Sequence, residues 1–426
     1  MSETSAKQQK LRIVIATPVY YPMINGVAVF SHNLAVGLAR RGHEVLVLTP
    51  SQTKKNHYEM SDGVGVQYLN SVPLHFYPDQ IQQVSTHQTI MGRKIPRFFY
   101  PDGFKASVFP FREVRKALDK FKPDVVHVQG ADPIGIAVVN YAKKRGIPVV
   151  TTEHNQPEVL TEPLGVPGII RQPVNSILSA YFRGRQRKSD YVTMPTRQAI
   201  EHLLGGRNLG VPVEAVSNGV DLSAFHSGAV PDEIYEKYQI PKNVPIVLYI
   251  GRVDPEKKVG IVLQAFGQFL DKHKLDSLSK TLFLVVGDGV DKEHLETEAK
   301  KMGIFGSVRF LGKILPPELY NIYRLGDVFV TASEVETQGI VLIEAAASGL
   351  PLIAVKAGAV GEVCQDGKNG FLVEPRDKQE IAEAMGKILT EPQLRKEMSE
   401  ASLEIASRHS LENTLDRYIE IYRKLC

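Results

Sequence analysis

Short apolar runs alternate with amphipathic stretches along most of this chain. The first apolar run, residues 11–17, is followed by residues 26–41, where apolar side chains recur at helical spacing, and then by a second apolar run at residues 44–49. A continuous apolar run is typical of a strand buried on both faces of a parallel sheet, and the helical period is typical of a helix that covers such a sheet. The beginning of the chain therefore predicts a βαβ unit.

The same alternation continues in two series. The first series predicts further strands at residues 124–128, 149–151 and 191–193. The second series begins after residue 221 and predicts strands at residues 246–251, 282–286, 308–311, 328–331 and 352–355. Because strands that alternate with helices form parallel sheets with helices on both faces, we expect an α/β protein with two doubly wound, Rossmann-like sheets.

Two domains also fit the length of the chain. Its 426 residues exceed what one compact core usually holds. We place the boundary within residues 212–221, which gives a first domain at residues 1–215, a second at residues 216–405, and a cleft between them. Residues 406–426 form a final segment that contains an amphipathic helix at residues 411–424.

One long segment, residues 51–102, does not follow the alternation. It is rich in aromatic side chains and proline, and we expect it to be the least regular part of the chain. The proline and glycine within residues 99–104 predict a turn there. No chemistry can be assigned to this segment.

Composition and charge narrow the classes of function. The 51 basic and 47 acidic residues leave a net charge of only +4, which gives no reason to expect a nucleic-acid partner. The two cysteines, Cys364 and Cys426, form neither a metal-ligand spacing nor a disulfide framework. No apolar stretch reaches the roughly 18 residues of a membrane-spanning helix, and residues 1–10 are polar. We therefore expect a cytoplasmic protein that binds no nucleic acid.

Two carboxylates, Glu336 and Glu344, flank a glycine where a predicted strand turns into a helix. The first amides of that helix, at Gly339, Ile340 and Val341, have no partner within the helix and can donate to a diphosphate. Glu336 precedes these amides and Glu344 follows them, so each carboxylate can accept hydrogen bonds from the vicinal hydroxyls of a sugar or a ribose. This arrangement predicts a nucleotide-sugar site. The alternative is a surface helix whose acidic residues suit the helix dipole.

Arg252 and Lys257 follow the strand predicted at residues 246–251. Open α/β sheets bind ligands at the carboxyl ends of their strands. The guanidinium offers a fork for phosphate oxygens and the ammonium a mobile point charge, so the two can neutralise a diphosphate without a metal. A solvated charged turn is the alternative for these residues taken alone. Their position in the same half as Glu336 and Glu344 favours the diphosphate site.

The first half of the chain offers three candidate residues. Gly26 and Val27 stand at the start of the first predicted helix, where a glycine lets the backbone approach a ligand closely. The G-x-G-x-x-G pattern of dinucleotide-binding loops is absent there. His154 directly follows a predicted strand, so its imidazole should project over the carboxyl edge of the sheet. It can contact a transferred sugar or a nearby proton, or it can be structural.

These motifs occur in a known order. The chain resembles the retaining GT-B glycosyltransferases of family four between Leu11 and Tyr422, on motifs at residues 26–27, 124–127, 151–155, 217–221, 251–257, 287–289, 310–312 and 336–344. The resemblance implies two Rossmann-like domains that face each other across a cleft, an acceptor-side first domain, a nucleotide-sugar-binding second domain, and a last helix that crosses back to the first. It also implies transfer of a hexose, with retention, from UDP-glucose or a similar nucleoside-diphosphate sugar to a lipid or glycan acceptor.

The resemblance assigns roles to the candidate residues. The catalytic set is His154, Arg252, Lys257 and Glu336, and the donor-binding set is Gly26, Val27, Ile314, Gly339, Ile340, Val341 and Glu344. Among these, the two cations hold the diphosphate, Glu336 binds the hydroxyls of the donor sugar, and Glu344 binds the ribose. Ile314 lies beside the base, and His154 contacts the sugar from the first domain. No cofactor and no metal is implied beyond the donor substrate itself.

The chain departs from the family in two places. Many relatives have a second histidine where this chain has Gln129 after His127, so we assign no catalytic role to His127. Relatives often have two glycines where this chain has Gly26 followed by Val27. Both this pair and residues 337–339 resemble members that glycosylate diacylglycerol, which hints at a lipid acceptor.

Other classes of function compete with a transferase. A UDP-sugar epimerase of the same fold would convert the donor without any acceptor. A sugar-nucleotide sensor without catalysis is a third hypothesis, but the charged residues are all retained. A glycosidase is disfavoured, because its paired carboxylates would have no reason to adjoin a phosphate-binding turn.

Residues 169–188 bear on contact with a membrane. They carry Ile170, Val174, Ile177 and Tyr181 at helical spacing, followed by Arg183, Arg185, Arg187 and Lys188. Such a helix can lie on an anionic bilayer, which would place the protein peripherally on the inner face of the membrane. A packed helix with a solvated basic end is the alternative, and Pro173 favours it by interrupting the amphipathic pattern.

Overall fold

The structure is a computed structural model that describes residues 10–73 apart from 22, 24 and 54, residues 89–90, 93–94 and 105–154, residue 161, and residues 168–426. The turn predicted at residues 99–104 lies outside these ranges. The chain forms two compact units, one comprising Met1–Val216 with Thr414–Cys426 and the other Ser217–Asn413. The final segment was expected from residue 406. In the structure α13 covers Pro392–Ser407 and the C-terminal helix α14 covers Leu411–Leu425.

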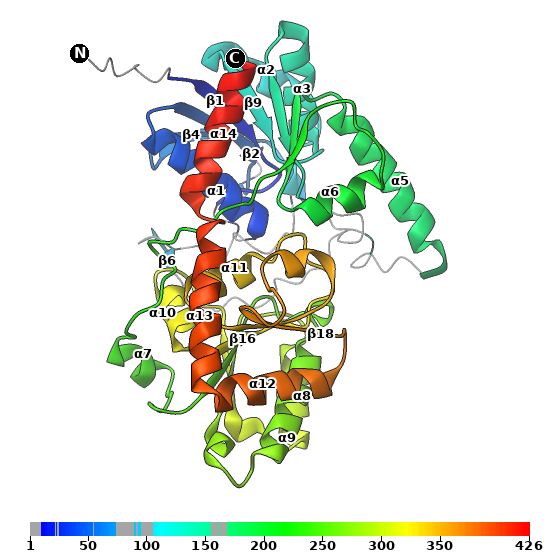
Figure 1. Cartoon of the computed structure of the whole chain (residues 1–426). Coiled ribbons are helices and arrows are strands. Elements are labelled where there is room, and N and C mark those ends of the chain that lie inside the picture. The colour runs from blue at the N-terminus through cyan, green and yellow to red at the C-terminus, as the bar shows by residue number, and fades with distance from the viewer. Residues whose placement is uncertain are drawn as a thin grey trace, which may run out of the picture. The chain divides into compact units, whose positions relative to one another are not determined.

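The first unit is built on an eight-stranded sheet in the order β12-β11-β10-β9-β1-β2-β4-β3. Figure 1 labels β1, β2, β4 and β9 of this sheet. The edge strand β3 (His57–Ser61) is antiparallel to β4. The parallel strands are β1 (Arg12–Ala16), β2 (Glu44–Pro50), β4 (Val64–Leu69), β9 (Val125–Val128), β10 (Val149–Thr152), β11 (Tyr191–Met194) and β12 (Val213–Ala215). The order of the strands reverses between β1 and β9, so the sheet is doubly wound. Doubly wound sheets bind ligands beyond the carboxyl ends of the two strands at which the order reverses.

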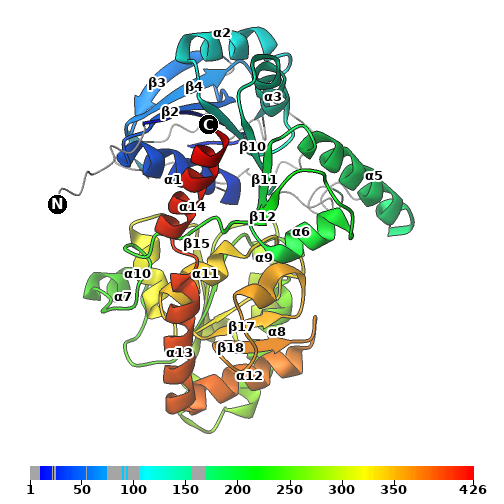
Figure 2. The same ribbon diagram turned by 45° about the horizontal axis from the view of Figure 1, so that its top comes forward.

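Helices cover both faces of this sheet. α2 (Phe111–Phe121) and α3 (Pro133–Arg145) pack against side chains such as Val14 and Val126. Because neighbouring side chains of a strand point to opposite faces, His127 faces the other side, where α1 (Gly26–Arg40) and α14 lie. The ring centroids of Phe30 on α1 and Tyr418 on α14 are 6.0 Å apart. α5 (Gly168–Gln186) extends away from the strands, and α6 (Arg197–Leu204) follows β11 (Figure 2).

The C-terminal helix is fastened to the sheet by close packing and by a buried histidine. Gly37 lets Leu415 of α14 pack closely on α1, because an added Cβ would lie 2.4 Å from Leu415 Cδ1 and the leucine would have to shift. His127 Nδ1 is 2.6 Å from the Tyr422 hydroxyl, and its Nε2 is 2.6 Å from Thr152 Oγ1. Burial lowers the pKa of His127 to about 3, so the ring is neutral at physiological pH. His127, to which we assigned no catalytic role, thus joins the last helix to the strands.

The second unit is built on a six-stranded sheet in the order β15-β14-β13-β16-β17-β18. Its strands are all parallel: β13 (Ile246–Ile250), β14 (Leu282–Val286), β15 (Val308–Gly312), β16 (Val328–Val330), β17 (Leu352–Val355) and β18 (Gly370–Val373). The order reverses between β13 and β16, so the loops after these two strands meet at the switch point of the sheet.

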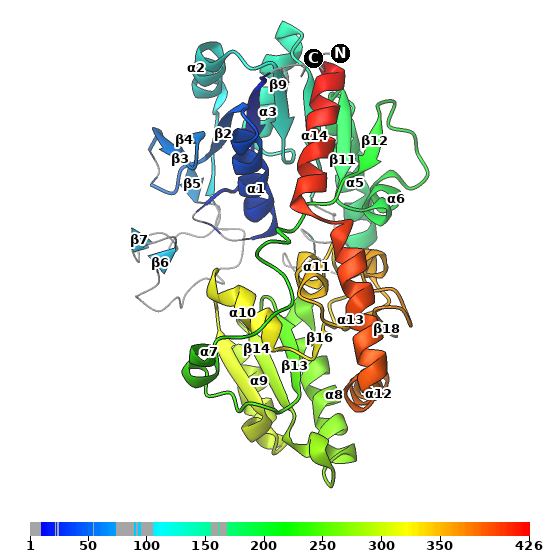
Figure 3. The same cartoon turned by 60° about the vertical axis from the view of Figure 1, so that its left-hand side comes forward.

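Helices lie on the two faces of this sheet (Figure 3), and an apolar core lies beneath them on each face. α8 (Val259–Lys272), α9 (Lys292–Lys301) and α12 (Lys378–Thr390) pack against one set of strand side chains, including Val247 and Phe283. α7 (Asp232–Lys237), α10 (Glu318–Leu325) and α11 (Ile340–Ala347) pack against the alternate set, including Leu248 and Phe329. The strand residues alternate between the cores because a strand has a side-chain period of two.

The prediction of two doubly wound sheets is confirmed. The expectation of irregular structure was wrong for residues 57–69, where β3 and β4 form a hairpin. Its turn residues, Asp62 and Gly63, have φ values of 54° and 78°. Asp-Gly is the typical pair for such a two-residue turn, so the sequence did contain the signal.

Among the described residues, no helix combines the length and the apolar character that a membrane crossing requires.

Candidate functional site

The loop after β13 carries Arg252 and Lys257 and is built around close backbone contacts. The Tyr249 hydroxyl donates to the Arg252 carbonyl at 2.7 Å, and Gly251 has a φ of 157°. An added Cβ at Gly287 would lie 1.8 Å from the Gly251 carbonyl oxygen, so only glycine permits this approach of the two loops. The loop after β13 is therefore held firmly against the loop after β14.

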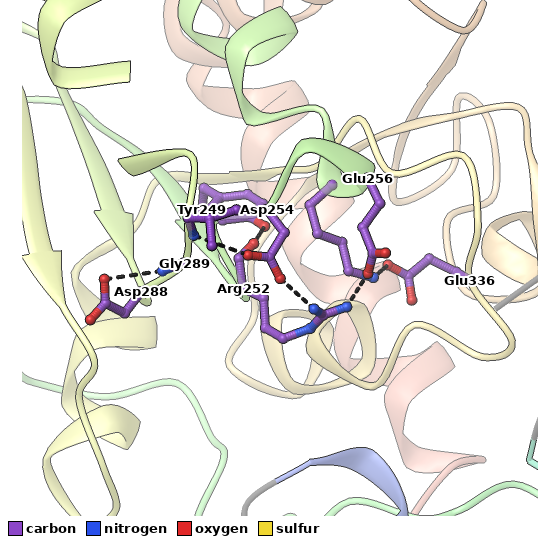
Figure 4. A network of polar contacts seen from close by, with 9 residues as sticks. Tyr249, Arg252, Asp254, Glu256, Asp288, Gly289 and Glu336 are labelled. Carbon is purple, nitrogen blue, oxygen red and sulfur yellow. Dashed lines mark hydrogen bonds and ion pairs between the residues drawn. The ribbon is translucent and has the colours of Figure 1, made fainter. Parts of the chain in front are cut away.

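Arg252 has two acidic partners in the same loop. Its guanidinium pairs with Asp254 on one side and Glu256 on the other, as Figure 4 shows. Asp254 is buried and also accepts from the Val290 amide at 3.2 Å, which ties the two loops together. The Arg252 side chain is 56% exposed. A diphosphate at this position would therefore have to displace carboxylates, of which Glu256 is the less buried.

Lys257 and Glu336 form an ion pair at the switch point. Lys257 Nζ is 2.7 Å from Glu336 Oε1, and the two side chains are only 19% and 16% exposed. The Glu336 carbonyl accepts from the Ala359 amide at 3.2 Å, and an added Cβ at Gly358 would lie 2.8 Å from the same oxygen. The structure thus brings together two residues that are 79 positions apart in sequence and holds the carboxylate by its backbone.

The start of α11 has the free donors that the sequence predicts. Gly339 is its N-cap with a φ of 73°, and no side chain caps the helix. Within the described part of the chain, the amides of Gly339, Ile340 and Val341 have no hydrogen-bond acceptor. Three amides that point out of a helix N-terminus form a ready site for an anion.

Glu344 lies in the second turn of α11, next to a tyrosine that the sequence did not single out. The Tyr323 hydroxyl donates to Glu344 Oε2 at 2.6 Å. Burial raises the pKa of Glu344 to about 7, and the hydrogen bond from Tyr323 opposes this rise. No sequence signal distinguishes Tyr323 from any other aromatic residue on a packed helix.

Gln338 is a second residue that the sequence analysis did not assign to the site. Its Oε1 accepts from the Asn218 amide at 3.2 Å, and its Nε2 donates to Ser217 Oγ at 2.7 Å. His409 Nδ1 is 3.1 Å from the same hydroxyl. Gln338 is thereby bonded to Ser217 and Asn218 at the start of the second unit, and Ser217 connects it to His409 near the end of that unit. Its position between Glu336 and Gly339 was the available hint.

Ile314 follows β15 and is almost fully buried in the core beneath α10 and α11. Its contact with a base stays a prediction.

In the first unit, the structure places Gly26 and Val27 in the first turn of α1. Asn25 caps this helix by accepting from the Ala28 amide at 2.9 Å, and Gly26 is exposed. The amides of this helix are thus partly satisfied by the protein itself.

His154 lies at the carboxyl end of β10, as the sequence predicts. Its Nε2–H donates to Gln129 Oε1 at 2.8 Å, and its ring meets Phe30 edge to face at 5.0 Å. Burial lowers its pKa to about 3, so the imidazole is neutral near pH 7 and is poorly suited to donate a proton. A hydrogen-bonding contact to a neutral sugar stays compatible with this geometry.

The basic run at the end of α5 is only partly exposed. Arg183 donates to the Leu203 carbonyl at 2.8 Å, and Arg185 lines a small cavity beside Glu153 and Gln186. Of the four basic residues at this end of the helix, Arg187 and Lys188 are exposed, whereas Arg183 and Arg185 are partly buried. Large apolar side chains are exposed on the same helix, namely Ile169, Ile170, Ile177 and Tyr181.

Family models match both halves of the chain. The model described as Glycosyltransferase Family 4 matches residues 24–224, and the model described as Glycosyl transferases group 1 matches residues 231–404. The alpha-monoglucosyldiacylglycerol synthase of Acholeplasma laidlawii is 27% identical over 98% of this chain and 96% of its own length. The protein of the same name from Streptococcus pneumoniae is 28% identical over 81% of this chain and 71% of its own.

Another relative is named for a different donor, and solved structures share the fold. A GDP-mannose-dependent alpha-mannosyltransferase of Mycobacterium tuberculosis is 28% identical over 85% of this chain and 84% of its own length. Among solved structures, sucrose-phosphate synthase from Thermosynechococcus elongatus has a TM-score of 0.71 at 20% identity, covering 97% of this chain and 98% of that one. Both family models and the shared fold lead to one conclusion: this chain belongs to the family-four glycosyltransferases and has the GT-B fold.

Proposed function

We propose that this protein is a retaining, metal-independent hexosyltransferase that uses a UDP-sugar, with UDP-glucose as the favoured donor, and a lipid acceptor. The observation that carries the proposal is the partly buried Lys257–Glu336 pair, which precedes the free amides of α11. A cation and helix amides can neutralise a diphosphate, while a carboxylate can accept hydrogen bonds from sugar hydroxyls. Lys257 would exchange Glu336 for phosphate oxygens when the donor binds, which would free the carboxylate for the sugar.

The same residues account for the charge that develops during transfer. Negative charge grows on the leaving diphosphate as the bond to the sugar breaks. Once the donor has displaced their carboxylate partners, Arg252 and Lys257 lie with the amide of Gly339 in place to stabilise this charge as it develops. With retention, the acceptor attacks from the face that the diphosphate leaves, and a phosphate oxygen takes the acceptor proton. No step in this account requires a metal ion.

A lipid acceptor is favoured over a glycan by two observations. The two relatives with the name alpha-monoglucosyldiacylglycerol synthase match 81% and 98% of this chain. In addition, α5 exposes Ile169 and Ile177 to 95% and 69%, which is unusual for isoleucine in a helix that faces water. Such side chains can enter the boundary of a bilayer, with Arg187 and Lys188 near anionic headgroups. The protein would then act peripherally on the cytoplasmic face of a membrane.

One experiment tests donor, acceptor and stereochemistry together. The protein is incubated with labelled UDP-glucose, UDP-galactose or GDP-mannose and with vesicles that contain diacylglycerol or a glucosylated diacylglycerol, or with soluble sugars. We expect an α-linked glycolipid from UDP-glucose, in equal yield with and without a chelator. A β-linked product would contradict retention, and loss of activity with the chelator would contradict metal independence.

The same assay separates the transferase from an epimerase. None of the relatives named above is an epimerase. An epimerase would convert the UDP-sugar to its epimer with no acceptor present, and a transferase would leave the sugar configuration unchanged. Conversion of the donor alone at the rate seen with acceptor would refute the proposal.

A further inference from the structure

Glu344 has one oxygen that is committed inside the protein. The Tyr323 hydroxyl donates to Oε2, and this bond joins α10 to α11. Tyr323 has no exposed surface, whereas Glu344 keeps part of its surface open. Within the described part of the chain, Oε1 has no hydrogen-bond partner. The carboxylate is therefore fixed on one side and available on the other.

Tyr323 is itself held in place by aromatic packing. Its ring meets Phe225 edge to face with centroids 5.4 Å apart, and it stacks on Phe329 at 6.3 Å. Close packing of this kind leaves a side chain a single orientation. The hydroxyl thus stays aimed at Glu344 whether or not a ligand is present, and it restricts rotation of the carboxylate.

We propose that Tyr323 is a positioning residue for the donor nucleotide: it fixes Glu344 so that Oε1 accepts hydrogen bonds from the vicinal hydroxyls of the ribose. This inference rests on the proposed function, because that function makes Glu344 a ligand of the nucleotide. A group held in its binding orientation before the ligand arrives loses less entropy on binding. Tyr323 therefore contributes to donor affinity without touching the donor.

The arrangement also predicts a pH dependence. A ribose diol donates its hydrogens, so it binds the ionised carboxylate better than the protonated acid. Burial raises the pKa of Glu344 to about 7, and Tyr323 is the one titratable group of the described chain that acts against this rise. Donor affinity should increase as the pH rises through 7. Removal of the Tyr323 hydroxyl raises the pKa of Glu344 further and moves this increase to higher pH.

The test compares the pH profiles of KM for UDP-glucose and of kcat in four proteins. These are the parent, Tyr323→Phe, Glu344→Gln, and Tyr235→Phe as a control that removes a hydroxyl from the partly exposed helix α7. Melting temperatures check that each variant is folded. Calorimetric binding of UDP gives the same pH profile if a variant has too little turnover to measure.

We expect Tyr323→Phe to raise KM about three- to tenfold at neutral pH, the size of one ordinary hydrogen bond, with kcat changed much less. Its profile should shift to higher pH, and Glu344→Gln should show no inflection near 7. A Tyr323→Phe profile that superimposes on that of the parent, while Glu344→Gln weakens binding, would refute the positioning role and leave the donor site intact. Unchanged UDP binding in Glu344→Gln would overturn this inference together with the assignment of the donor site.

Discussion

The two sheets share a strand order at their centres, but the carboxyl edges of their strands carry opposite chemistry. In the second unit, this edge carries the Lys257–Glu336 ion pair and the free amides of α11. In the first unit, the corresponding edge carries the contact between His154, which burial keeps neutral, and the amide of Gln129. One topology therefore supports two kinds of site, and the side chains decide which. The charged edge suits an anionic diphosphate, and the neutral edge suits uncharged hydroxyls.

The largest effect should come from the charged edge. Lys257→Ala and Glu336→Ala should each lower turnover about 100-fold, the typical loss when one fixed group that stabilises a transition state is removed. Lys356→Ala is the matched control, because Lys356 is an exposed lysine that pairs with Glu374 at 2.7 Å in the same unit. Steady-state rates would be measured together with melting temperatures. Near-parental rates in both folded variants would show that the ion pair is structural.

A smaller effect should come from the neutral edge. His154→Ala should lower turnover about tenfold, the loss expected for one hydrogen bond to a neutral group, and should leave UDP binding unchanged. His202→Ala, on the exposed side of α6, serves as the control. Calorimetry with UDP and rates with UDP-glucose separate the two quantities. A large loss of UDP affinity in His154→Ala would break the distinction between the two edges.

Mild acid should affect the surroundings of His127 and His154 and the surroundings of Glu344 with opposite sign. The pKa values of His127 and His154 are lowered to about 3, so their contribution to stability is complete above their usual value of 6.5 and declines as the pH falls towards 3. The pKa of Glu344 is raised from 4.5 to about 7, so its ionisation costs stability increasingly as the pH rises through that range.

Lowering the pH from neutral to one unit below the usual histidine value should thus destabilise the first unit by on the order of 1 kcal/mol per histidine. The second unit should hold or gain stability near Glu344. Hydrogen exchange at both pH values can follow α14 and α11 separately. Equal loss of protection in both helices would contradict the assignment of neutral and charged edges.

The smallest effect concerns the acidic partner of Arg252. Glu256→Gln removes a competitor for the guanidinium and should strengthen UDP binding about threefold, as expected for a partly exposed ion pair. Glu404→Gln is a control, because Glu404 pairs with Arg408 at 2.5 Å in an exposed helix of the same unit. Weaker UDP binding in Glu256→Gln would show that Glu256 supports the bound state of the loop rather than competing with the diphosphate.

The sequence predicted the architecture well because strands and helices of a doubly wound sheet have distinct periods. Most predicted strands agree with the observed ones within two residues, for example Leu282–Val286 and Leu352–Val355. The hairpin at residues 57–69 was missed because its first strand, β3, is short, polar and stands at the sheet edge, although the Asp62–Gly63 turn signalled it.

The candidate site was predictable to the extent that its residues stand beside strand ends. Arg252, Lys257, Glu336 and Glu344 were found in this way, and the structure brings Lys257 and Glu336 into contact. Tyr323 and the partners of Gln338 could not be predicted, because their contacts span 21 and 121 positions and depend on how helices pack. The pairing of Arg252 with its own loop was also missed, since spacing alone does not show which carboxylate a guanidinium selects.

The central claim is that the charged edge of the second unit binds the nucleotide diphosphate. Hydrogen exchange with and without saturating UDP tests it most directly. We expect new protection of the amides at Gly339, Ile340 and Val341 and of the loop that holds Arg252 and Lys257, with loss of that protection in Lys257→Ala. UDP binding that leaves these amides unprotected in the parent protein would contradict the claim.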